Sequence, residues 1–215
     1  MEYILKSTQY ILLGSGVTLK LMLITITLSI PLGFICAIGK NSRLIAIRIL
    51  METYTSIVRG TPLLLQLFFI YYGVPLIFPG LRFERFNAAA ITFVINYGSY
   101  FTEIFRGGIQ SIEKGQYEAS RVLGMNYSQT MIRIILPQTI KRVLPPVANE
   151  AITLVKDTAL VTVLGIGDIL RNSKEIVSRD FTIVPFIIAA LLYLAMNYIM
   201  VLIFKALEKR YSVYE

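Results

Sequence analysis

The sequence predicts an all-α protein that crosses a membrane several times. Of its 215 residues, 55% are hydrophobic and 16% are charged, whereas soluble domains usually carry roughly 25% charged residues. Apolar runs long enough to cross a bilayer as helices recur along the chain, separated by short charged segments. A soluble fold would need a polar surface that this composition cannot supply.

Composition also excludes several kinds of chemistry. The one cysteine, Cys36, lies in the first apolar run, so the chain can form neither an internal disulfide nor a thiolate metal cluster. The chain contains no histidine, which removes the commonest general base and the commonest zinc ligand. The phosphate-binding pattern GxxxxGK(S/T) is absent, so the chain is not itself an ATPase. We therefore expect no catalytic residue, no metal and no cofactor.

Five transmembrane helices are expected. The amino-terminal stretch MEYILKSTQYILL lacks the features of a cleaved signal peptide, and its alternation of apolar and polar residues predicts a segment lying along the membrane interface. A more polar run, Leu50 to Arg59, is expected at the cytoplasmic interface before the second span. The spans are predicted at about Val17–Gly39, Gly60–Phe78, Asn87–Phe105, Val147–Ile166 and Ile183–Ala206.

Positive charge predicts the orientation of these spans. Twelve Lys and Arg residues lie in the segments 40–48, 106–142 and 205–210, whereas six lie in the segments that alternate with them. The positive-inside bias then puts the amino terminus outside and the carboxyl terminus in the cytoplasm. The net charge of +8 is therefore a signal of topology, and nucleic acid is not expected as a partner because the basic residues are divided among short loops.

The longest polar segment joins the third and fourth spans and includes EASRVLGMNYSQTMIRIILP, residues 118–137. Residues Glu118 to Leu123 favour a helix, Gly124 can end it, and Ser128 can cap a second helix. Pro137 is then expected to break or kink that second helix. The residues alone leave two interpretations open, an amphipathic helix lying on the membrane and a helix that docks into a partner's groove.

A set of polar residues lies at membrane depth in the last three spans. On the third span, one helical face carries Asn96, Ser99, Tyr100 and Glu103. The fourth span contributes Glu150, Thr153, Lys156, Asp157 and Leu160. The fifth span contributes Asn197. A charge inside a membrane costs several kcal/mol, on the order of 3 or more, unless it meets a cavity or a partner. One interpretation is a site for an amino acid, with Glu103 and Asp157 accepting from cationic groups. The other is that Glu103 forms a structural ion pair with Lys156 or Arg106.

The polar segment resembles the EAA loop of bacterial ABC importer permeases. The resemblance rests on Glu118-Ala119-Ser120, on Gly124 four residues later, and on Ile134-x-Leu136-Pro137, with Ser in a position where the family often has Ala. Three more stretches are similar to the polar amino acid branch of that family: RGTPLLLQLFFIYYG (59–73), EIFRGGIQSIEKGQYEA (103–119) and LVKDTAL (154–160). The resemblance extends over nearly the whole chain, and the order and spacing of the motifs make it specific.

That resemblance implies a single permease domain over 1–215, with an EAA loop at about 106–142 and a coupling helix at about 117–126. It also implies partners: a second permease subunit, expected to be an identical copy, a dimer of cytoplasmic ABC ATPase subunits, and an external amino acid-binding protein. The residues expected to contact the ATPase are Glu118, Ala119, Ser120, Arg121, Leu123 and Gly124.

The function expected is ATP-driven import of a polar amino acid across the bacterial inner membrane. The substrate-binding residues are predicted to be Asn96, Ser99, Tyr100, Glu103, Asp157, Leu160 and Asn197. Two acidic groups favour a basic amino acid such as arginine, lysine or histidine, with glutamine as a further candidate. The alternative is an autonomous carrier or channel in which Glu103 and Asp157 bind an ion or a proton.

Overall fold

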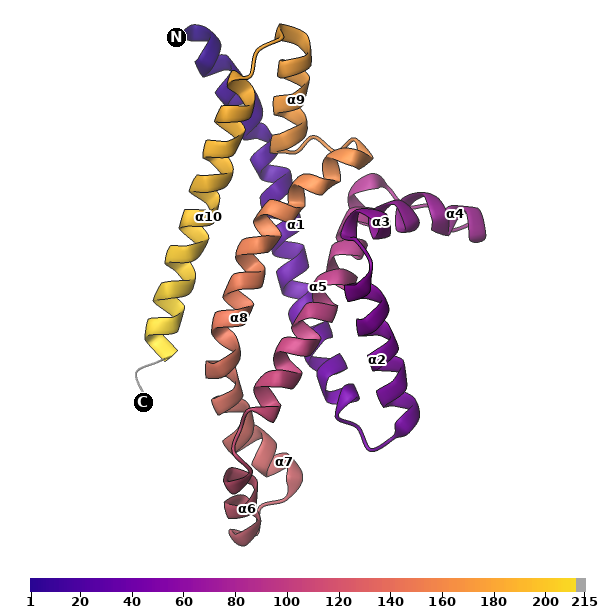
Figure 1. Cartoon of the computed structure of the whole chain (residues 1–215), viewed down its shortest axis with the longest axis vertical. Coiled ribbons are helices and arrows are strands. Elements are labelled where there is room, and N and C mark those ends of the chain that lie inside the picture. Colours follow the sequence, from indigo (N-terminus) through magenta and orange to yellow (C-terminus); the bar gives the residue numbers. More distant parts are fainter. Residues whose placement is uncertain (212–215) are drawn as a thin grey trace.

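The chain folds into an elongated bundle of α-helices (Figure 1). The structure, a computed structural model, describes residues 1–211, and over that range it is all-α as predicted. The α-helices are α1 (Glu2–Lys40), α2 (Ile45–Gly60), α3 (Leu63–Phe68), α4 (Val74–Ile77), α5 (Arg85–Gln110), α6 (Lys114–Val122), α7 (Tyr127–Thr130), α8 (Leu136–Asp157), α9 (Ile169–Asp180) and α10 (Val184–Tyr211). Two π-helical turns, Phe69–Gly73 and Met131–Ile135, and a 3-10 helix, Thr158–Leu164, complete the set.

Helices α1 and α10 are each long and apolar enough to cross a membrane, and the bent pair of α2 with α3–α4 gives a third candidate span within the described residues. Helix α1 begins at Glu2, well before the predicted start at Val17. The segment expected at the membrane interface forms the first turns of α1. Its contact with α9 explains the extension, because Gly14 of α1 packs directly against the backbone at Asp168 and Ile169.

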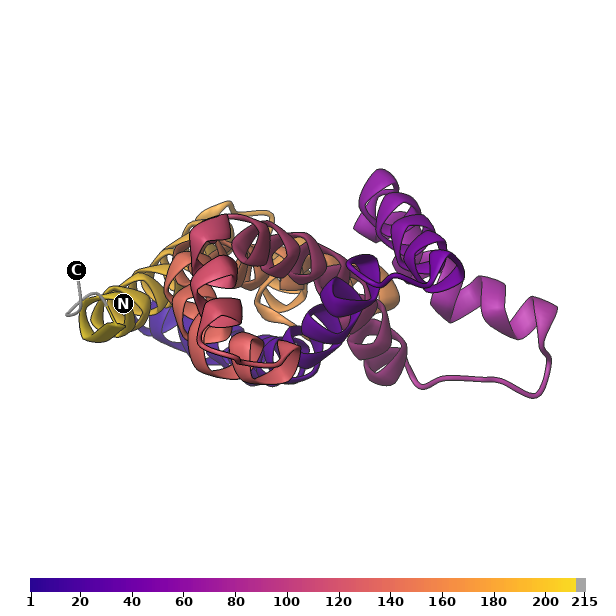
Figure 2. The ribbon, with the colours of Figure 1, turned by 90° about the horizontal axis from the view of Figure 1, so that it is seen from below.

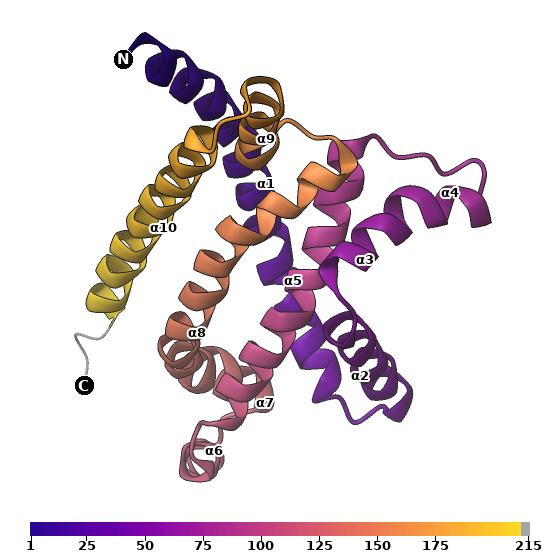
Figure 3. The ribbon, with the colours of Figure 1, turned by 45° about the horizontal axis from the view of Figure 1, so that its top comes forward.

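The second predicted span, Gly60–Phe78, coincides with α3, the π-helical turn Phe69–Gly73 and α4, and it is bent sharply against α2. Helices α2 and α3–α4 meet at 106°, and Figure 3 shows them diverging from one point. Thr61 and Pro62 have extended backbones, and Pro62 has no N–H for a helical hydrogen bond, so α2 ends before them. The Gln66 side chain donates to the carbonyl oxygens of Val58 (2.7 Å) and Thr61 (3.1 Å), which the break leaves without helical partners. The predicted interfacial run Leu50–Arg59 therefore belongs to the first arm of a bent element.

The polar segment between α5 and α8 forms a helix, a turn and a second helix. Helix α6 ends before Gly124, whose φ of 72° is in the left-handed region expected of a glycine after a helix. The predicted cap was wrong: Asn126, not Ser128, caps α7, because its side chain and that of Gln129 each accept from the other's backbone N–H.

The prediction that Pro137 breaks or kinks the second helix also needs correction. The helix widens into the π-helical turn Met131–Ile135 and continues as α8, with Pro137 in the first turn of that helix. The π-helical turn directly before Pro137 accommodates the proline, because a local change in hydrogen-bond spacing can take up a missing N–H inside a continuous helix. Pro145 and Pro146 also lie inside α8. Helix α8, which corresponds to the fourth predicted span, therefore starts well before the predicted Val147. It is followed by a 3-10 helix that begins at Thr158.

Helices α1 and α5 form the centre of the bundle through close contact of their backbones. A Cβ added at Gly33 of α1 would lie 2.6 Å from the Cβ of Phe101 and 3.0 Å from the carbonyl oxygen of Gly98, both on α5. Phe93, Tyr97 and Phe101 of α5 are almost fully buried in the main core. In contrast, the α3–α4 segment extends sideways from the bundle (Figure 2).

Helix α9 was not among the predicted elements. It begins at a strong cap, since the Asp168 carboxylate accepts from the backbone N–H groups of Leu170 (3.2 Å) and Arg171 (3.0 Å). A second apolar cluster, formed by Ile11 of α1, Ile169 and Ile176 of α9, and Ala189 of α10, holds it between the two long helices.

The close α1–α5 contact predicts a difference between two glycines of α1. Gly33→Ala should lower the free energy of unfolding by about 1–3 kcal/mol, because the new methyl group overpacks the α5 backbone. Gly16→Ala is the matched control: nothing lies within 4 Å of its added Cβ, so the better helix propensity of alanine should leave stability unchanged or raise it by up to about 1 kcal/mol. Thermal unfolding of both variants in detergent measures the difference, and equal melting temperatures would contradict the packing described.

Candidate functional site

A polar pocket of about 510 Å³ opens between the α2–α3 bend, α5 and α8. It is lined by Arg59, Gly60, Thr61, Pro62 and Leu63 at the bend, by Asn96, Tyr97 and Tyr100 of α5, and by Glu150, Thr153 and Asp157 of α8. The α8 residues recur at intervals of three and four, which puts them on one face of that helix. The pocket therefore brings together three elements that are distant in sequence.

One wall of the pocket is fixed by a bond between α5 and α8. The hydroxyl of Tyr97, a nearly fully buried residue, donates to the Asp157 carboxylate at 2.7 Å. A hydrogen bond to an ionised acceptor is shorter and stronger than a neutral one. A carboxylate can accept about four hydrogen bonds. Asp157, which lines the pocket, can therefore accept further hydrogen bonds there.

The pocket also contains a cation held over an aromatic ring. The Arg59 guanidinium lies 5.3 Å from the centroid of the Tyr100 ring, within the range of a cation–π interaction. Arg59, at the end of α2, faces a pocket that also contains the carboxyl groups of Glu150 and Asp157. A small zwitterion matches this set, because its ammonium group can meet a carboxylate and its carboxylate can meet the guanidinium.

The bend itself is connected to α5 by an amide pair. Asn96 donates from Nδ2 to the Gln66 Oε1 at 3.0 Å, while the Gln66 amide nitrogen holds the carbonyl groups of the bend. The wall formed by residues 59–63 is therefore connected, through Gln66, to Asn96, which itself lines the pocket.

Glu103 does not join Asp157 in this pocket. One carboxylate oxygen accepts from the Lys40 ammonium group, and the other forms an ion pair with Arg106 at 2.8 Å. Lys40 also donates to Thr55 of α2 at 2.9 Å, so the cluster links the ends of α1, α2 and α5. Of the two interpretations, the ion pair with Arg106 is the one present, and Lys40 takes the place predicted for Lys156.

Three other predicted site residues also lie away from the pocket lining. Ser99 is fully buried and donates to the backbone carbonyl of Asn96 at 2.6 Å. Leu160 packs against the main apolar core from the 3-10 helix. Asn197 belongs to α10, where its Oδ1 is buried and has no hydrogen-bond partner among residues 1–211. Of the predicted set, Asn96, Tyr100 and Asp157 line the pocket.

Four polar residues of the pocket were not in the predicted substrate-binding set: Arg59, Tyr97, Glu150 and Thr153. Arg59 was expected to belong to an interfacial run, because the 106° bend that turns it toward α5 has no clear sequence signal beyond Thr61-Pro62. Glu150 and Thr153 were named among the polar residues at membrane depth, and their spacing to Asp157, which is the spacing of one helical face, could have added them to the predicted site.

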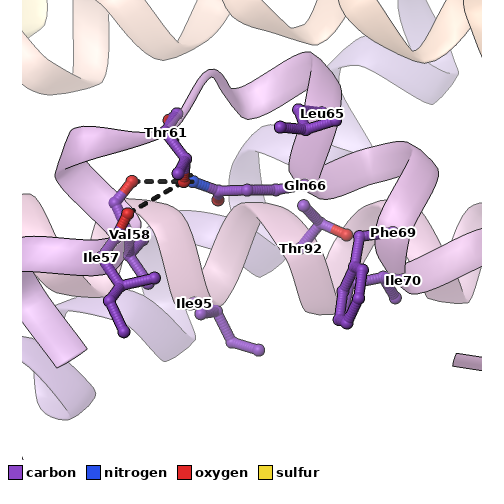
Figure 4. Close-up of a pocket in the computed structure, with 9 residues that line it drawn as sticks. All are labelled: Ile57, Val58, Thr61, Leu65, Gln66, Phe69, Ile70, Thr92 and Ile95. Atoms are coloured by element: carbon purple, nitrogen blue, oxygen red, sulfur yellow. Dashed lines mark hydrogen bonds between the residues drawn. The ribbon is translucent and has the colours of Figure 1, made fainter. Parts of the chain in front are cut away.

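A second pocket, of about 440 Å³, lies on the other side of the bend (Figure 4). Its lining is Ile57, Val58, Thr61, Leu65, Gln66, Phe69, Ile70, Thr92 and Ile95. Figure 4 shows the Gln66 amide directed at Val58 and Thr61, so its donor is already engaged in holding the bend. This pocket offers an apolar surface and no charged group, which makes it unsuited to a zwitterion.

The predicted coupling residues lie on α6 and the turn after it. Glu118, Ala119, Arg121, Leu123 and Gly124 are exposed, whereas Ser120 is buried and donates to the Gln116 carbonyl at 2.7 Å. Val122 and Leu123 are 88% and 77% exposed, and Tyr127 is 73% exposed. Adjacent exposed apolar side chains on a short polar helix form an apolar patch that a partner protein or a lipid surface can cover.

Comparisons with known proteins agree with this architecture. Residues 29–213 match the family described as "Binding-protein-dependent transport system inner membrane component". The chain is 37% identical to the arginine transport system permease protein ArtQ of Bacillus subtilis (strain 168), over 94% of this chain and 92% of that protein. It is also 37% identical to the putative glutamine transport system permease protein GlnP of Rickettsia felis, over 99% of both.

A solved structure titled as an amino acid ABC transporter with histidines matches with a TM-score of 0.90 and 35% identity, over 97% of both chains. The fold of the MetNI methionine ABC transporter also matches, with a TM-score of 0.74 at 15% identity. With this agreement in sequence and in fold, the chain belongs to the family of binding-protein-dependent transport system inner membrane components, as the non-catalytic permease subunit of an ABC transporter.

Proposed function

We propose that this permease moves a polar amino acid through the pocket between the α2–α3 bend, α5 and α8. The observation that supports this most directly is the presence in one pocket of a guanidinium, Arg59, and two carboxyl groups, Glu150 and Asp157. The relatives with arginine, glutamine and cystine in their names belong to transport systems for polar amino acids. Two carboxyl groups against one guanidinium favour a basic substrate such as arginine, lysine or histidine, and glutamine remains a second candidate.

Within that pocket we assign direct substrate contacts to Asn96, Tyr100 and Asp157. Glu103 is assigned a structural role instead, because both of its carboxylate oxygens are engaged by Lys40 and Arg106. The site is at the junction of helix ends, which is where transporters commonly bind charged substrates.

We further infer the arrangement in the bacterial inner membrane. Five spans formed by α1, the bent α2–α4 element, α5, α8 and α10 place the amino terminus outside and the carboxyl terminus in the cytoplasm, as the excess of Lys and Arg on one side favours. Helices α5 and α8 are the more polar spans, and their polar faces are directed at the pocket and at paired groups.

The complete transporter in this proposal contains a cytoplasmic ABC ATPase dimer, an external amino acid-binding protein and two copies of this chain, embedded in lipid. Residues 1–215 form one permease domain, and the loop 106–142 presents a coupling helix, 117–126, to the ATPase. The exposed side chains of Val122 and Leu123 support that docking, since an amphipathic helix binds a groove through such apolar anchors.

Reconstitution in proteoliposomes tests the function as a whole. The importer should accumulate labelled arginine or glutamine only when the binding protein, the ATPase and ATP are all present. The competing hypothesis, an autonomous carrier or channel, expects uptake without nucleotide. It is less well supported because Glu103, one of its two expected ion ligands, is held by two cations.

Removing the charge of the pocket carboxylate should slow transport without unfolding the protein. Asp157→Asn keeps the shape of the side chain but removes a charge-assisted hydrogen bond to the substrate, which contributes about 1.5–3 kcal/mol. Uptake should fall roughly ten- to a hundredfold, since 1.4 kcal/mol corresponds to about a factor of ten. The measurement is initial uptake by the reconstituted complex, normalised to folded protein.

Glu103→Gln is the contrasting variant. It leaves Lys40 and Arg106 without their anionic partner, so the expected loss is stability, about 1–3 kcal/mol, with near-normal uptake per folded complex. Normal uptake by Asp157→Asn, or a specific transport defect in a stable Glu103→Gln protein, would show that the assignment of the two carboxylates is wrong.

The turn after α6 gives a separate prediction about coupling. Gly124 has a φ of 72° and open space around an added Cβ, so only backbone strain opposes a side chain there. Left-handed backbone costs an L-residue about 1–2 kcal/mol, but Asn adopts it far more readily than a β-branched residue. Gly124→Val should therefore weaken ATPase binding and uptake, while Gly124→Asn retains most of both. The reverse order of the two variants in a co-purification assay would contradict this role of the turn.

A further inference from the structure

The residue that follows α9 has an unusual backbone conformation. Among residues 1–211, Phe181 is the one non-glycine residue with a positive φ, at 51°. Its N–H donates to the Val177 carbonyl at 2.9 Å, so it terminates α9 in the left-handed conformation where glycine is usual. For a bulky residue this conformation is a genuine outlier, and strain of this kind is retained where a side chain is needed in one direction.

The side chain that this conformation positions is almost entirely outside the fold. Phe181 is 92% exposed, and Ile183, two residues later, is 68% exposed. The two buried isoleucines of α9, Ile169 and Ile176, are on the side packed against α1 and α10. Packing within the chain therefore does not account for the phenyl ring of Phe181.

The exposed pair directly precedes a stripe of exposed apolar side chains on α10. From Ile183, exposed apolar side chains recur at intervals of three or four residues along the helix: Ile187, Leu191, Leu194, Tyr198 and Leu202, each about half to two-thirds exposed. In a membrane permease, such a stripe on a span faces lipid. Phe181 and Ile183 extend the stripe beyond the start of α10 at Val184.

The surroundings of this end of the bundle have the composition of a membrane interface. The start of α1, the end of α9 and the start of α10 lie together at the end of the molecule that is at the top of Figure 1. Tyr3, Lys6, Tyr10 and Arg179 line a shallow pocket there. Tyrosines and basic residues with long apolar stems are typical of the headgroup layer, where an apolar body meets lipid and a polar tip meets water.

We propose that Phe181 and Ile183 insert into the lipid leaflet at this end of α10 and anchor the junction of α9 with the last span. The left-handed conformation of Phe181 ends α9 with the ring outside the fold, three residues before α10 begins. The inference requires only that the chain is a membrane permease, and it is independent of what the polar pocket binds.

Nitroxide spin labels at single cysteines test the proposal in the assembled transporter. Phe181→Cys, Leu191→Cys and Ser178→Cys are made in a Cys36→Ser background with cysteine-free partner subunits, and the complexes are placed in lipid nanodiscs. Leu191 marks lipid and Ser178, exposed on α9 one turn before Phe181, marks water. Each label's collisions with oxygen, which partitions into lipid, are compared with its collisions with a water-soluble nickel chelate.

The expected result is an oxygen-to-nickel collision ratio at position 181 that approaches the ratio at 191 and exceeds the ratio at 178 severalfold. Equal ratios at 181 and 178 would overturn the proposal. So would a nickel-accessible label at 181 that becomes immobile only when the external binding protein is added, because the ring would then contact that protein. Uptake by each labelled complex verifies that the proteins measured are folded.

Discussion

Helix α5 contains polar side chains that a membrane interior does not tolerate without partners, and the partners come from a different element each time. Asn96 pairs with Gln66 of α3, Tyr97 with Asp157 of α8, and Glu103 with Lys40 of α1. Each bond offsets the desolvation of a buried polar group and also fixes one neighbour relative to α5. The close backbone contact of α1 and α5 at Gly33 holds together the two helices that carry the Lys40–Glu103 pair.

The two carboxylates Glu103 and Asp157 differ in how far their oxygens are engaged by partners within the chain. Both oxygens of Glu103 face cations, so this group is neutralised by its own chain. Asp157 receives one hydrogen bond from Tyr97 and otherwise faces a pocket of about 510 Å³. A charge in that setting is stabilised best when a cationic ligand enters, since an unpaired charge at membrane depth is costly. This difference in local pairing is the basis on which we propose different roles for the two acidic residues.

Periodicity in the sequence was enough to predict the helical class, the long apolar helices and the left-handed turn at Gly124, because each depends on local residues. It could not predict that α2 and α3 meet at 106°, or that α9 packs between α1 and α10, since both depend on contacts distant in sequence. The candidate site was predicted in part for the same reason. Asn96, Tyr100 and Asp157 follow from helical spacing, whereas Arg59 reaches the pocket only through the bend.

The location of the pocket follows from where the backbone is irregular. Its wall at Arg59–Leu63 is the break between α2 and α3, and Asp157 is the last α-helical residue before the 3-10 helix Thr158–Leu164. Irregular backbone exposes carbonyl and N–H groups, which a membrane tolerates only where protein or a polar cavity satisfies them. Gln66 satisfies the carbonyl groups of the break from the apolar side, which leaves the opposite side of the bend open to the pocket. A break that would be costly in lipid is therefore stable here because it borders a polar cavity, and the cavity has its shape because the helices break there.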